Sequence, residues 1–367
     1  MGKIKVAHII CDLLPGGGQK STTDLIKSTE GKVENYLVLL ENKRSYEVEG
    51  IKTFFICEDK KIYKKLDILG DYLLSLKLRK LLQELEIDIV VSHMEVTAKV
   101  LRFINIPKIY YMRVDITQEL KVLEKNSFTR YKKREYLYKK IFDGQNLITI
   151  SQDTEKNLLH FLSPKKIQTI YNPFDLENIP QLANEAANVP EEDYLIQIGS
   201  DIKRKRQDIL LEAFSKIKDR NIKLLLLGTE ENEEILNLIE KFNIQRNRII
   251  FHPFTTNPYP FIKNAKILIM SSQREGLPRV IVESLALETP VVSTDCDTGP
   301  REILIGELKP YLAKVNDPDD LAEKIDLALE RYPEITDRYI EKFDKREISE
   351  NFLLYVKSII ANQPEQQ

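Results

Sequence analysis

Short apolar runs alternate with helical patterns along the N-terminal half of the chain. Between the runs, helical spacing appears at Gln19–Ser28 and at Leu66–Leu85, where leucines and Lys80 recur every three or four residues. The apolar runs have the length of buried strands and are predicted at Lys3–Ile10, Tyr36–Leu40, Thr53–Ile56, Ile87–Ser92, Lys108–Met112 and Leu147–Ile150. Strands that alternate with helices predict an α/β fold with a doubly wound parallel sheet.

The same alternation resumes after a polar stretch. Leu176–Asp193 contains Pro180 and Pro190 and is interpreted as a linker. Strands are then predicted at Tyr194–Gly199, Lys223–Gly228, Arg248–His252, Ile267–Ser271 and Val291–Thr294. Helices are predicted at Ile209–Ile217, after the strand Lys223–Gly228 as far as about Phe242, and at Ser349–Ile360. A chain of 367 residues is long enough for two domains, which we place at 1–175 and 176–348.

Composition narrows the class of protein. The chain is 42% hydrophobic and 31% charged, which predicts soluble domains with substantial cores, and its net charge of −2 argues against nucleic-acid binding. The three cysteines (Cys11, Cys57 and Cys296) form no C-x-x-C pair, so neither a disulfide framework nor a zinc site is expected. With no long apolar segment and too short an apolar stretch at the N-terminus for a signal peptide, we expect a cytoplasmic protein.

The stretch Glu275–Glu283, reading EGLPRVIVE, joins two predicted elements. The apolar residues before it indicate a strand, and those after Pro278 indicate a helix with Pro278 at its first position. A loop that leads from the carboxyl end of a parallel strand into a helix is where open α/β sheets bind ligands. The N–H groups at the helix start also suit phosphate. This stretch is therefore the principal candidate site.

Its two glutamates occupy different positions. Glu275 falls on the loop and Glu283 in the second turn of the helix, among apolar neighbours. A buried carboxylate needs a partner, because an unpaired buried charge is costly. The partner of Glu283 could be a sugar or ribose hydroxyl of a ligand, or a basic side chain in a structural salt bridge. If Glu283 instead lies on an exposed helix face, it needs no partner. The spacing alone leaves these alternatives open.

Two features of the first half also lie at predicted strand ends. Gly16, Gly17 and Gly18 follow the first strand, where glycine lets backbone approach a ligand closely or simply forms a tight turn. Their spacing matches neither the dinucleotide fingerprint nor a Walker loop. His93 follows the strand Ile87–Ser92, where a histidine either faces a ligand or has a structural role.

One segment is both basic and aromatic. Residues 130–142, RYKKREYLYKKIF, combine six basic residues with three tyrosines and a phenylalanine. This composition fits either a helix on an anionic membrane surface or a solvated helix face. We favour the membrane interpretation, because the aromatic content exceeds what solvation requires.

Taken together, these motifs resemble the retaining glycosyltransferases of family 4 (glycosyl transferases group 1), which have the GT-B fold. The resemblance covers nearly the whole chain. It rests on EGLPRVIVE with the following SLALETPVVSTDCDTGPREIL, the glycine loop, His93, Tyr171-Asn172-Pro173 and KRQDILLEAF. The family implies two Rossmann-like domains that face each other across a cleft, with a C-terminal helix, about 349–362, packing back on the first domain.

The resemblance also implies roles for the matching residues of the second domain. Glu283 would hold the ribose hydroxyls of the nucleotide, and Glu275 would contact the donor sugar near the reacting centre. The backbone amides of Gly276 and Leu277 would meet sugar or phosphate. Lys205 would pair with the diphosphate, which gains negative charge as the glycosidic bond breaks. Among these residues, Glu275 and Lys205 are the candidate catalytic ones.

In the first domain, His93 matches a histidine that contacts the donor hexose and is a third catalytic candidate. Gly16 and Gly17 would approach the phosphates or the acceptor. Gly199 ends the first strand of the second domain, and many members carry an arginine directly after this glycine. Here that position is Ser200, in GSDIKRK, so Arg204 or Lys203 would supply the second positive charge.

Two D-x-D sequences match a metal–diphosphate motif of a different transferase fold, but each has another interpretation. Asp317 is interpreted as a helix cap and Asp295 as the end of a strand. The resemblance implies no metal and no other cofactor, since Lys205 and helix N–H groups would neutralise the diphosphate.

The expected function is retaining transfer of a sugar from a nucleotide-diphosphate sugar, UDP-hexose or UDP-HexNAc, to a surface-glycan acceptor such as lipopolysaccharide or a lipid-linked oligosaccharide. The enzyme would work in the cytoplasm, on the inner face of the plasma membrane. The alternatives are a nucleotide-sugar epimerase or hydrolase on the same fold, and a non-catalytic binding subunit of a glycan-synthesis complex. A Rossmann oxidoreductase fits poorly, because its glycine fingerprint is absent.

Overall fold

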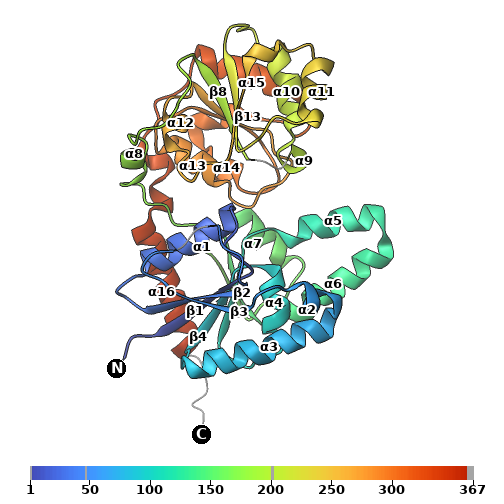
Figure 1. Ribbon diagram of the computed structural model, residues 1–367, viewed down its shortest axis with the longest axis vertical. Helices are drawn as coiled ribbons and strands as arrows, with labels where there is room; N and C mark the ends of the chain where they lie inside the picture. The colour runs from blue at the N-terminus through green and yellow to red at the C-terminus, as the bar shows by residue number, and fades with distance from the viewer. Residues whose placement is uncertain (1, 46–47, 200–201, 362–367) are drawn as a thin grey trace. The chain divides into compact units, whose positions relative to one another are not determined.

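The computed structural model describes residues 2–45, 48–199 and 202–361. The chain divides into two compact units (Figure 1). The first unit comprises Met1–Pro173 and Lys345–Gln367, and the second comprises Phe174–Asp344. Within the described residues, none of the helices combines the length and the apolar character that a membrane-spanning helix needs.

The first unit is a seven-stranded parallel sheet in the order β3-β2-β1-β4-β5-β6-β7. Its strands are β1 (Lys5–Ile10), β2 (Glu34–Glu41), β3 (Lys52–Cys57), β4 (Ile89–Ser92), β5 (Lys108–Met112), β6 (Asn146–Thr149) and β7 (Lys166–Thr169). Its helices are α1 (Gly17–Ser28), α2 (Lys61–Lys65), α3 (Asp67–Glu84), α4 (Glu95–Leu101), α5 (Ile116–Asn126), α6 (Phe128–Phe142), α7 (Gln152–Leu159) and α16 (Lys345–Ala361).

Side chains alternate between the two faces of this sheet. Ala7 and Ile9 of β1 point into the larger core, which α3, α4, α5, α6 and α7 cover. The intervening residue His8 points to the other face, where its ring lies 5.9 Å from the ring of Phe352 in α16. Helix α16 is tied to the sheet edge by the Tyr355 hydroxyl, which donates to the carbonyl oxygens of Leu147 (2.9 Å) and Lys166 (3.1 Å).

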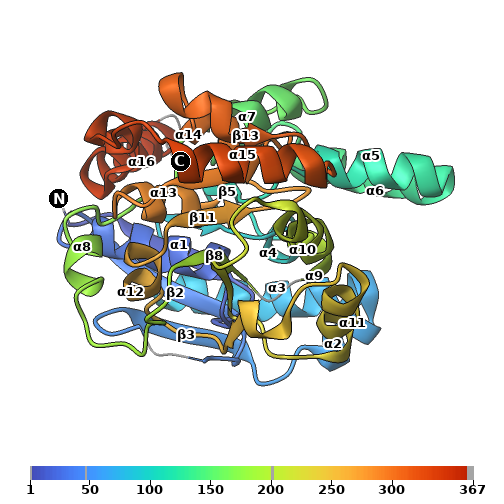
Figure 2. The same cartoon turned by 90° about the horizontal axis from the view of Figure 1, so that it is seen from above.

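The second unit is a six-stranded parallel sheet in the order β10-β9-β8-β11-β12-β13, seen from above in Figure 2. Its strands are β8 (Tyr194–Ile198), β9 (Lys223–Leu227), β10 (Ile249–His252), β11 (Ile267–Met270), β12 (Val291–Thr294) and β13 (Leu312–Ala313). Its helices are α8 (Ile179–Leu182), α9 (Ile202–Lys205), α10 (Gln207–Lys216), α11 (Glu233–Lys241), α12 (Tyr259–Lys263), α13 (Arg279–Leu285), α14 (Pro300–Ile303) and α15 (Pro318–Glu330).

The doubly wound parallel sheets predicted from the apolar runs are confirmed in both units. The helix predicted at Leu66–Leu85 is confirmed as α3, which spans Asp67–Glu84. The short helix α2 precedes it, and the chain bends between the two at Asp67, whose φ of 47° is left-handed. The segment interpreted as a linker contains α8. The prediction of Asp317 as a helix cap is confirmed, since its side chain accepts a hydrogen bond from the Asp320 N–H at 3.0 Å.

In each sheet the strand order reverses at one place. In the first unit this switch point lies between β1 and β4, and in the second between β8 and β11. The loops that leave two such strands run to opposite sides of the sheet and leave an opening at the carboxyl ends, where open α/β sheets bind ligands. Residues on these four loops are therefore the ones placed to bind a ligand.

Candidate functional site

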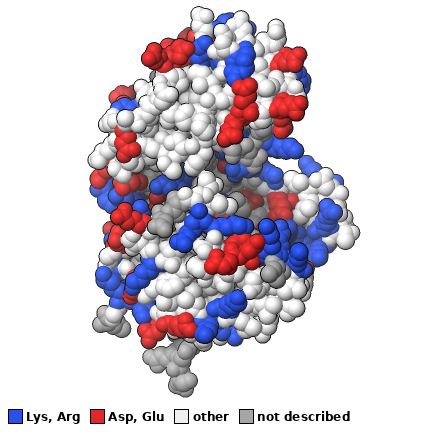
Figure 3. All heavy atoms as spheres, in the orientation of Figure 1, with Lys and Arg blue, Asp and Glu red and all other residues white. Residues whose placement is uncertain are grey.

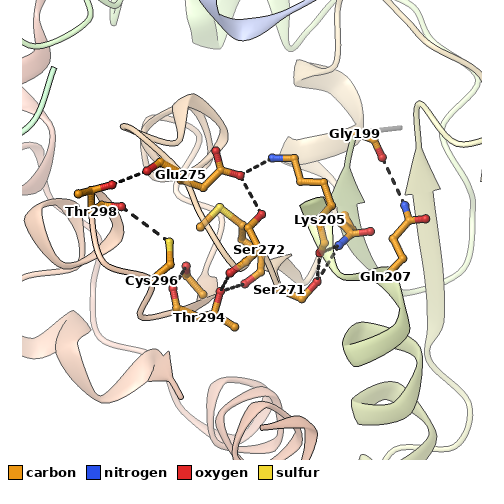
Figure 4. A network of polar contacts seen from close by, with 12 residues as sticks. Gly199, Lys205, Gln207, Ser271, Ser272, Glu275, Thr294, Cys296 and Thr298 are labelled. Atoms are coloured by element: carbon orange, nitrogen blue, oxygen red, sulfur yellow. Dashed lines mark hydrogen bonds and ion pairs between the residues drawn. The ribbon is translucent and has the colours of Figure 1, made fainter. Parts of the chain in front are cut away.

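Lys205 and Glu275 form a nearly buried ion pair at the switch point of the second sheet (Figure 4). Lys205 Nζ lies 2.8 Å from Glu275 Oε1, and the two side chains are 12% and 9% exposed. Ser272 Oγ donates to the same carboxylate oxygen at 2.8 Å. Burial by itself would raise the pKa of Glu275, but the charge and hydrogen bond of Lys205, joined by the charge of Arg204 and the hydrogen bond of Ser272, lower the pKa below its ordinary value. The carboxylate is therefore ionised at neutral pH.

The backbone around Lys205 is held by buried polar side chains. Its carbonyl oxygen accepts hydrogen bonds from Ser271 Oγ (2.6 Å) and from Gln197 Nε2 (3.4 Å). Gly199 has a φ of +128°, and a Cβ there would lie 3.1 Å from Lys205 Cε, so glycine leaves room for the lysine stem. Ser200, the position at which the family resemblance leads one to expect an arginine, lies outside the described residues. The loop after β8 is thus built to fix one ammonium group opposite Glu275.

The loop that carries Glu275 rests on the segment after β12. Thr294 Oγ1 donates to the Ser272 carbonyl oxygen at 2.6 Å, and Thr298 Oγ1 donates to the carbonyl oxygen of Glu275. Gly299 has a φ of +93°, and a Cβ on it would lie 2.5 Å from the Gly276 carbonyl oxygen and 2.7 Å from Pro278 Cδ. Only glycine permits this approach. Gly299 was not predicted as a site residue from the sequence, although its T-G-P context before a helix is a turn signal.

We therefore expect Gly299→Ala to lower the free energy of unfolding by about 3 kcal/mol, because a strained φ and a backbone clash combine. Gly306→Ala is the matched control, since Gly306 also has a positive φ (+56°) but nothing lies within 4 Å of a Cβ there. The control should cost only about 1 kcal/mol. Urea unfolding of both variants measures the difference. Equal costs would show that the contact with the Glu275 loop does not matter.

Glu283 already has a partner in its own helix. Arg279 Nη2 lies 3.2 Å from Glu283 Oε1, both side chains are buried, and the Arg279 guanidinium stacks 4.4 Å above the Phe174 ring. The structural salt bridge that the sequence left open is present, at the i, i+4 spacing that could have predicted it. Pro278 is the N-cap, with extended ψ of 106°, and the helix begins at Arg279, so its prediction as the first helical residue is wrong.

The remaining candidates of the second unit surround the ion pair. Gly276 is half-buried and Leu277 is buried, directly before α13. Arg204 and Lys203 are exposed on α9, and the Arg204 carbonyl oxygen accepts a hydrogen bond from the Gln273 N–H at 3.3 Å. The structure therefore brings the loops after β8 and β11 into direct contact.

Gly16 and Gly17 lie at the switch point of the first sheet. Gly16 is the N-cap of α1, with an extended φ of 176°, and its carbonyl oxygen accepts a hydrogen bond from the Lys20 N–H at 3.1 Å. A Cβ on Gly18 would lie 3.9 Å from Cε of Met94, which follows His93 after β4. The glycine loop and the segment after β4 are therefore neighbours.

His93 is completely buried, and both of its ring nitrogens are hydrogen-bonded within the protein. Nδ1 lies 3.0 Å from Arg113 Nη2 and Nε2 lies 2.9 Å from His8 Nδ1. The chain continues from His8 Nε2 to Asn35 Oδ1 at 3.2 Å, and Asn35 Nδ2 donates to the Ile26 carbonyl oxygen at the end of α1. The ring therefore has no exposed surface in this structure.

The direction of the hydrogen bonds in this chain follows from Arg113. A guanidinium only donates, so His93 Nδ1 accepts, its Nε2–H donates to His8, and His8 in turn donates to Asn35. Burial, followed by the Arg113 charge, lowers the pKa of His93 well below its ordinary value. Burial likewise lowers the pKa of His8 to about 3. Both rings are therefore neutral at physiological pH, which the single direction of donation requires.

Arg113 is the charged end of this chain. It directly follows β5, is half-buried, donates to the Asn172 side chain, and stacks 4.3 Å above the Tyr111 ring. Its Nη2 also lies 3.5 Å from Thr22 Oγ1 in α1. The sequence reasoning missed both Arg113 and His8. An arginine directly after a predicted strand, and a histidine inside an apolar strand, were the available signals.

Both D-x-D sequences have structural roles. Asp295 Oδ1 accepts a hydrogen bond from Arg301 Nε at 2.9 Å, and Asp317 caps α15. Asp319 Oδ1 lies 2.8 Å from Lys216 Nζ. Among the residues that the structure describes, no group of three or more His, Cys, Asp or Glu side chains is arranged to hold a metal ion.

Comparison with known proteins gives consistent matches along the chain. The family model described as Glycosyltransferase Family 4 matches residues 15–178, and that of Glycosyl transferases group 1 matches residues 178–346. The chain is 26% identical over 366 residues to the N-acetylgalactosamine-N,N'-diacetylbacillosaminyl-diphospho-undecaprenol 4-alpha-N-acetylgalactosaminyltransferase of Campylobacter jejuni, covering 96% of this chain and 99% of the relative. It is 28% identical to an uncharacterized glycosyltransferase of Methanocaldococcus jannaschii, covering 78% and 72%.

Solved structures share the fold. The crystal structure of Anabaena Alr3699/HepE in complex with UDP and glucose superimposes with a TM-score of 0.76 at 17% identity, covering 97% of this chain and 100% of that chain. The apo form of the lipopolysaccharide outer core galactosyltransferase WaaB gives a TM-score of 0.70 at 16% identity, covering 97% and 99%.

Proposed function

Because the chain belongs to the family 4 glycosyltransferases, of the GT-B fold, we propose that it transfers a hexose or N-acetylhexosamine from a UDP-sugar to a lipid-linked or surface glycan. A glycosyltransferase of glycan synthesis is the class to which its relatives belong. The observation that carries the finer proposal is the Lys205–Glu275 pair at the switch point of the second sheet. This pair presents an ammonium and an ionised carboxylate side by side on the loops expected to bind the ligand.

The two charges suit two parts of a nucleotide sugar. Lys205 has three N–H donors, so it can keep Glu275 and still meet the diphosphate oxygens. Negative charge grows on the diphosphate as the glycosidic bond breaks, so this contact strengthens in the transition state. Glu275 would accept hydrogen bonds from sugar hydroxyls and stabilise positive charge at the reacting carbon. Gly276 and Leu277 would add backbone N–H donors at the start of α13.

Retention would follow from attack on the same face as departure. The Glu275 carboxylate is engaged by Lys205 and Ser272. Because these contacts stabilise its charge, we propose a short-lived ion pair rather than a glycosyl-enzyme on this residue. Glu283, beside Arg279, would bind the ribose hydroxyls, and Arg204 or Lys203 the second phosphate. In the first unit, Gly16 and Gly17 would approach the phosphates or the acceptor.

The reaction is proposed to need no metal. The exposed cations of α9 and the Lys205 ammonium provide positive charge near the loop after β8. The D-x-D aspartates support this proposal by their existing partners, Arg301 for Asp295 and Lys216 for Asp319.

The acceptor is proposed to be carried on a lipid at the inner face of the plasma membrane. The name of the Campylobacter relative specifies a diphospho-undecaprenol acceptor, and WaaB is named for lipopolysaccharide. The basic segment 130–142 forms most of α6, but Tyr138, Ile141 and Phe142 are buried in the core. This segment therefore exposes fewer apolar side chains than its composition suggested, and less apolar surface could enter a membrane interface.

A thermal-shift screen against a panel of nucleotide sugars tests the donor. We expect one UDP-sugar to stabilise the wild type by roughly 3 kcal/mol at 100 times its Kd. Glu283→Ala should lose most of this shift, whereas Glu323→Ala, an exposed glutamate of α15, should keep it. No stabilisation by any nucleotide sugar would contradict the proposal. Product analysis then distinguishes transfer from hydrolysis or epimerisation, and binding without turnover would indicate a non-catalytic subunit.

A further inference from the structure

Helix α3 exposes an apolar stripe that the core of the first unit does not use. Its core-facing side chains are Leu74, Leu78 and Leu82. The opposite side carries Leu66, Ile68, Leu69, Tyr72, Leu73 and Leu76, each between 37% and 60% exposed. The leucines whose spacing predicted an amphipathic helix are therefore those on its exposed side. We call these six residues the α3 stripe.

The stripe is continuous because of its spacing. Ile68, Tyr72 and Leu76 lie at successive intervals of four residues, as do Leu69 and Leu73, so all five share one helix face. Scattered single apolar residues on a surface need no explanation, but a contiguous apolar patch marks an interaction site. The long apolar side chains on this face therefore indicate a surface that something covers.

Positive charge flanks the stripe. Residues 60–80 contain seven Lys or Arg and two Asp. Lys60, Lys61, Lys64 and Lys65 precede the stripe, whereas Lys77, Arg79 and Lys80 follow it. Of the two acidic residues, Asp71 is half-buried and lies 3.5 Å from Arg102. In Figure 3 the blue side chains gather over α2 and α6.

The packing of α2 holds its lysines beside the stripe. Gly70 of α3 faces α2 so closely that a Cβ on it would lie 1.9 Å from the Tyr63 carbonyl oxygen. Lys77 Nζ lies 5.4 Å from the centre of the Tyr63 ring, which adds a cation–π contact between the two helices. The bend at Asp67 and the glycine contact therefore fix the lysines and the apolar stripe as one surface, the α2–α3 surface (residues 60–80).

We propose that the α2–α3 surface docks on the anionic face of a lipid bilayer, with the α3 stripe in the acyl–headgroup boundary and the lysines on phosphate. This inference rests on the proposed function, since it places the enzyme where a lipid-linked acceptor resides. Leucine and aromatic side chains flanked by lysine are the composition of helices that lie in a membrane interface. A protein partner fits less well, because lysine is depleted from protein–protein interfaces. Helix α6, by contrast, exposes Phe128 and Tyr136 but buries the end of its apolar face.

Vesicle co-sedimentation of the full chain, without donor, tests the surface. Vesicles of phosphatidylcholine mixed with phosphatidylglycerol should bind the wild type, and phosphatidylcholine alone should bind it weakly. The triple variant Ile68→Ser, Leu69→Ser, Leu73→Ser should weaken binding by about a hundredfold, because three apolar side chains leave the boundary. The variant Lys61→Ser, Lys64→Ser, Lys65→Ser should weaken binding by more than tenfold and reduce its dependence on salt.

The matched control is the variant Phe128→Ser, Tyr136→Ser, which removes the exposed aromatic residues of α6 and should bind vesicles as the wild type does. Loss of binding in this control, with none in the α3 variants, would assign docking to α6 and overturn the inference. A dimer in analytical ultracentrifugation that the triple variant converts to monomer would assign the stripe to a second copy and overturn it as well. Donor-induced thermal shifts separate the two proposals: a donor shift without vesicle binding defeats only this inference, and the reverse result defeats only the proposed function.

Discussion

Replacing Lys205 by methionine should lower kcat by roughly a thousandfold, because the variant loses the ammonium that meets the diphosphate as it gains charge. Methionine keeps the length of the side chain, so the packing against Gly199 is retained. Glu275→Gln, which keeps the shape of the carboxylate, should cost a similar factor. Steady-state kinetics with the donor identified by the thermal-shift screen measures both. A Lys205→Met variant with wild-type kcat would remove Lys205 from the proposed mechanism.

The ion pair makes a second, independent prediction about pH. In the wild type the pKa of Glu275 lies below its ordinary value, so the carboxylate stays ionised when the pH falls from neutral towards 5. In Lys205→Met the burial of Glu275 remains while its main counter-charge is lost, so its pKa should rise. The residual activity of the variant should therefore decline at a higher pH than that of the wild type. Identical acid limbs would show that Glu275 ionisation does not depend on Lys205.

The lowered pKa of Glu275 also affects the stability of the folded protein. A carboxylate whose pKa is lowered by folding stabilises the folded state above its unfolded pKa, about 4.3, and this contribution is lost as the pH falls through the folded value. Removing one partner of a buried pair leaves the other charge uncompensated, which costs about 3–5 kcal/mol in fully buried cases. Thermal melting of Lys205→Met at neutral pH must therefore accompany the kinetics, and kcat is compared only where the variant is folded.

The sequence predicted the sheets well because buried parallel strands are continuous apolar runs. Strand β12 has the predicted bounds, and Glu275 falls on the predicted loop. The pattern was less informative for α3, because apolar residues on both sides of a helix give a spacing that does not say which side is buried. Only the packing distinguishes Leu74, which faces the core, from Leu73, which faces outwards.

The site was predictable where its residues are consecutive and not where they meet only in space. Glu275 and Lys205 are 70 positions apart, and their proximity follows from β8 and β11 being neighbours, which local patterns do not specify. The contact of Gly299 with Gly276 likewise depends on how two loops pack. His93 was recognisable as a single residue after a strand, whereas its partner His8 lies within β1 and its partner Arg113 follows β5.

Replacing Arg113 by alanine should lower kcat/KM by about a hundredfold, and His93→Ala should cost a similar or smaller factor. The reason is that His93 has no exposed surface and ends its hydrogen-bond chain on Arg113. We propose that the His8–His93 chain is a positioning device: two neutral rings orient the guanidinium at the carboxyl end of β5, where it can meet sugar hydroxyls or phosphate. Losing the rings would leave the cation in place but let it rotate.

The double variant decides between this role and a direct contact. If His93 acts through Arg113, adding His93→Ala to Arg113→Ala should cost little more than Arg113→Ala alone, because the group it positions is already absent. If the imidazole contacts the sugar itself, the two losses should multiply. His8→Asn provides the next link, since it keeps one donor and one acceptor on a smaller side chain and should lower kcat/KM by a smaller factor than His93→Ala. Urea unfolding of each variant separates these effects from loss of the fold, because all three residues are packed against the same sheet.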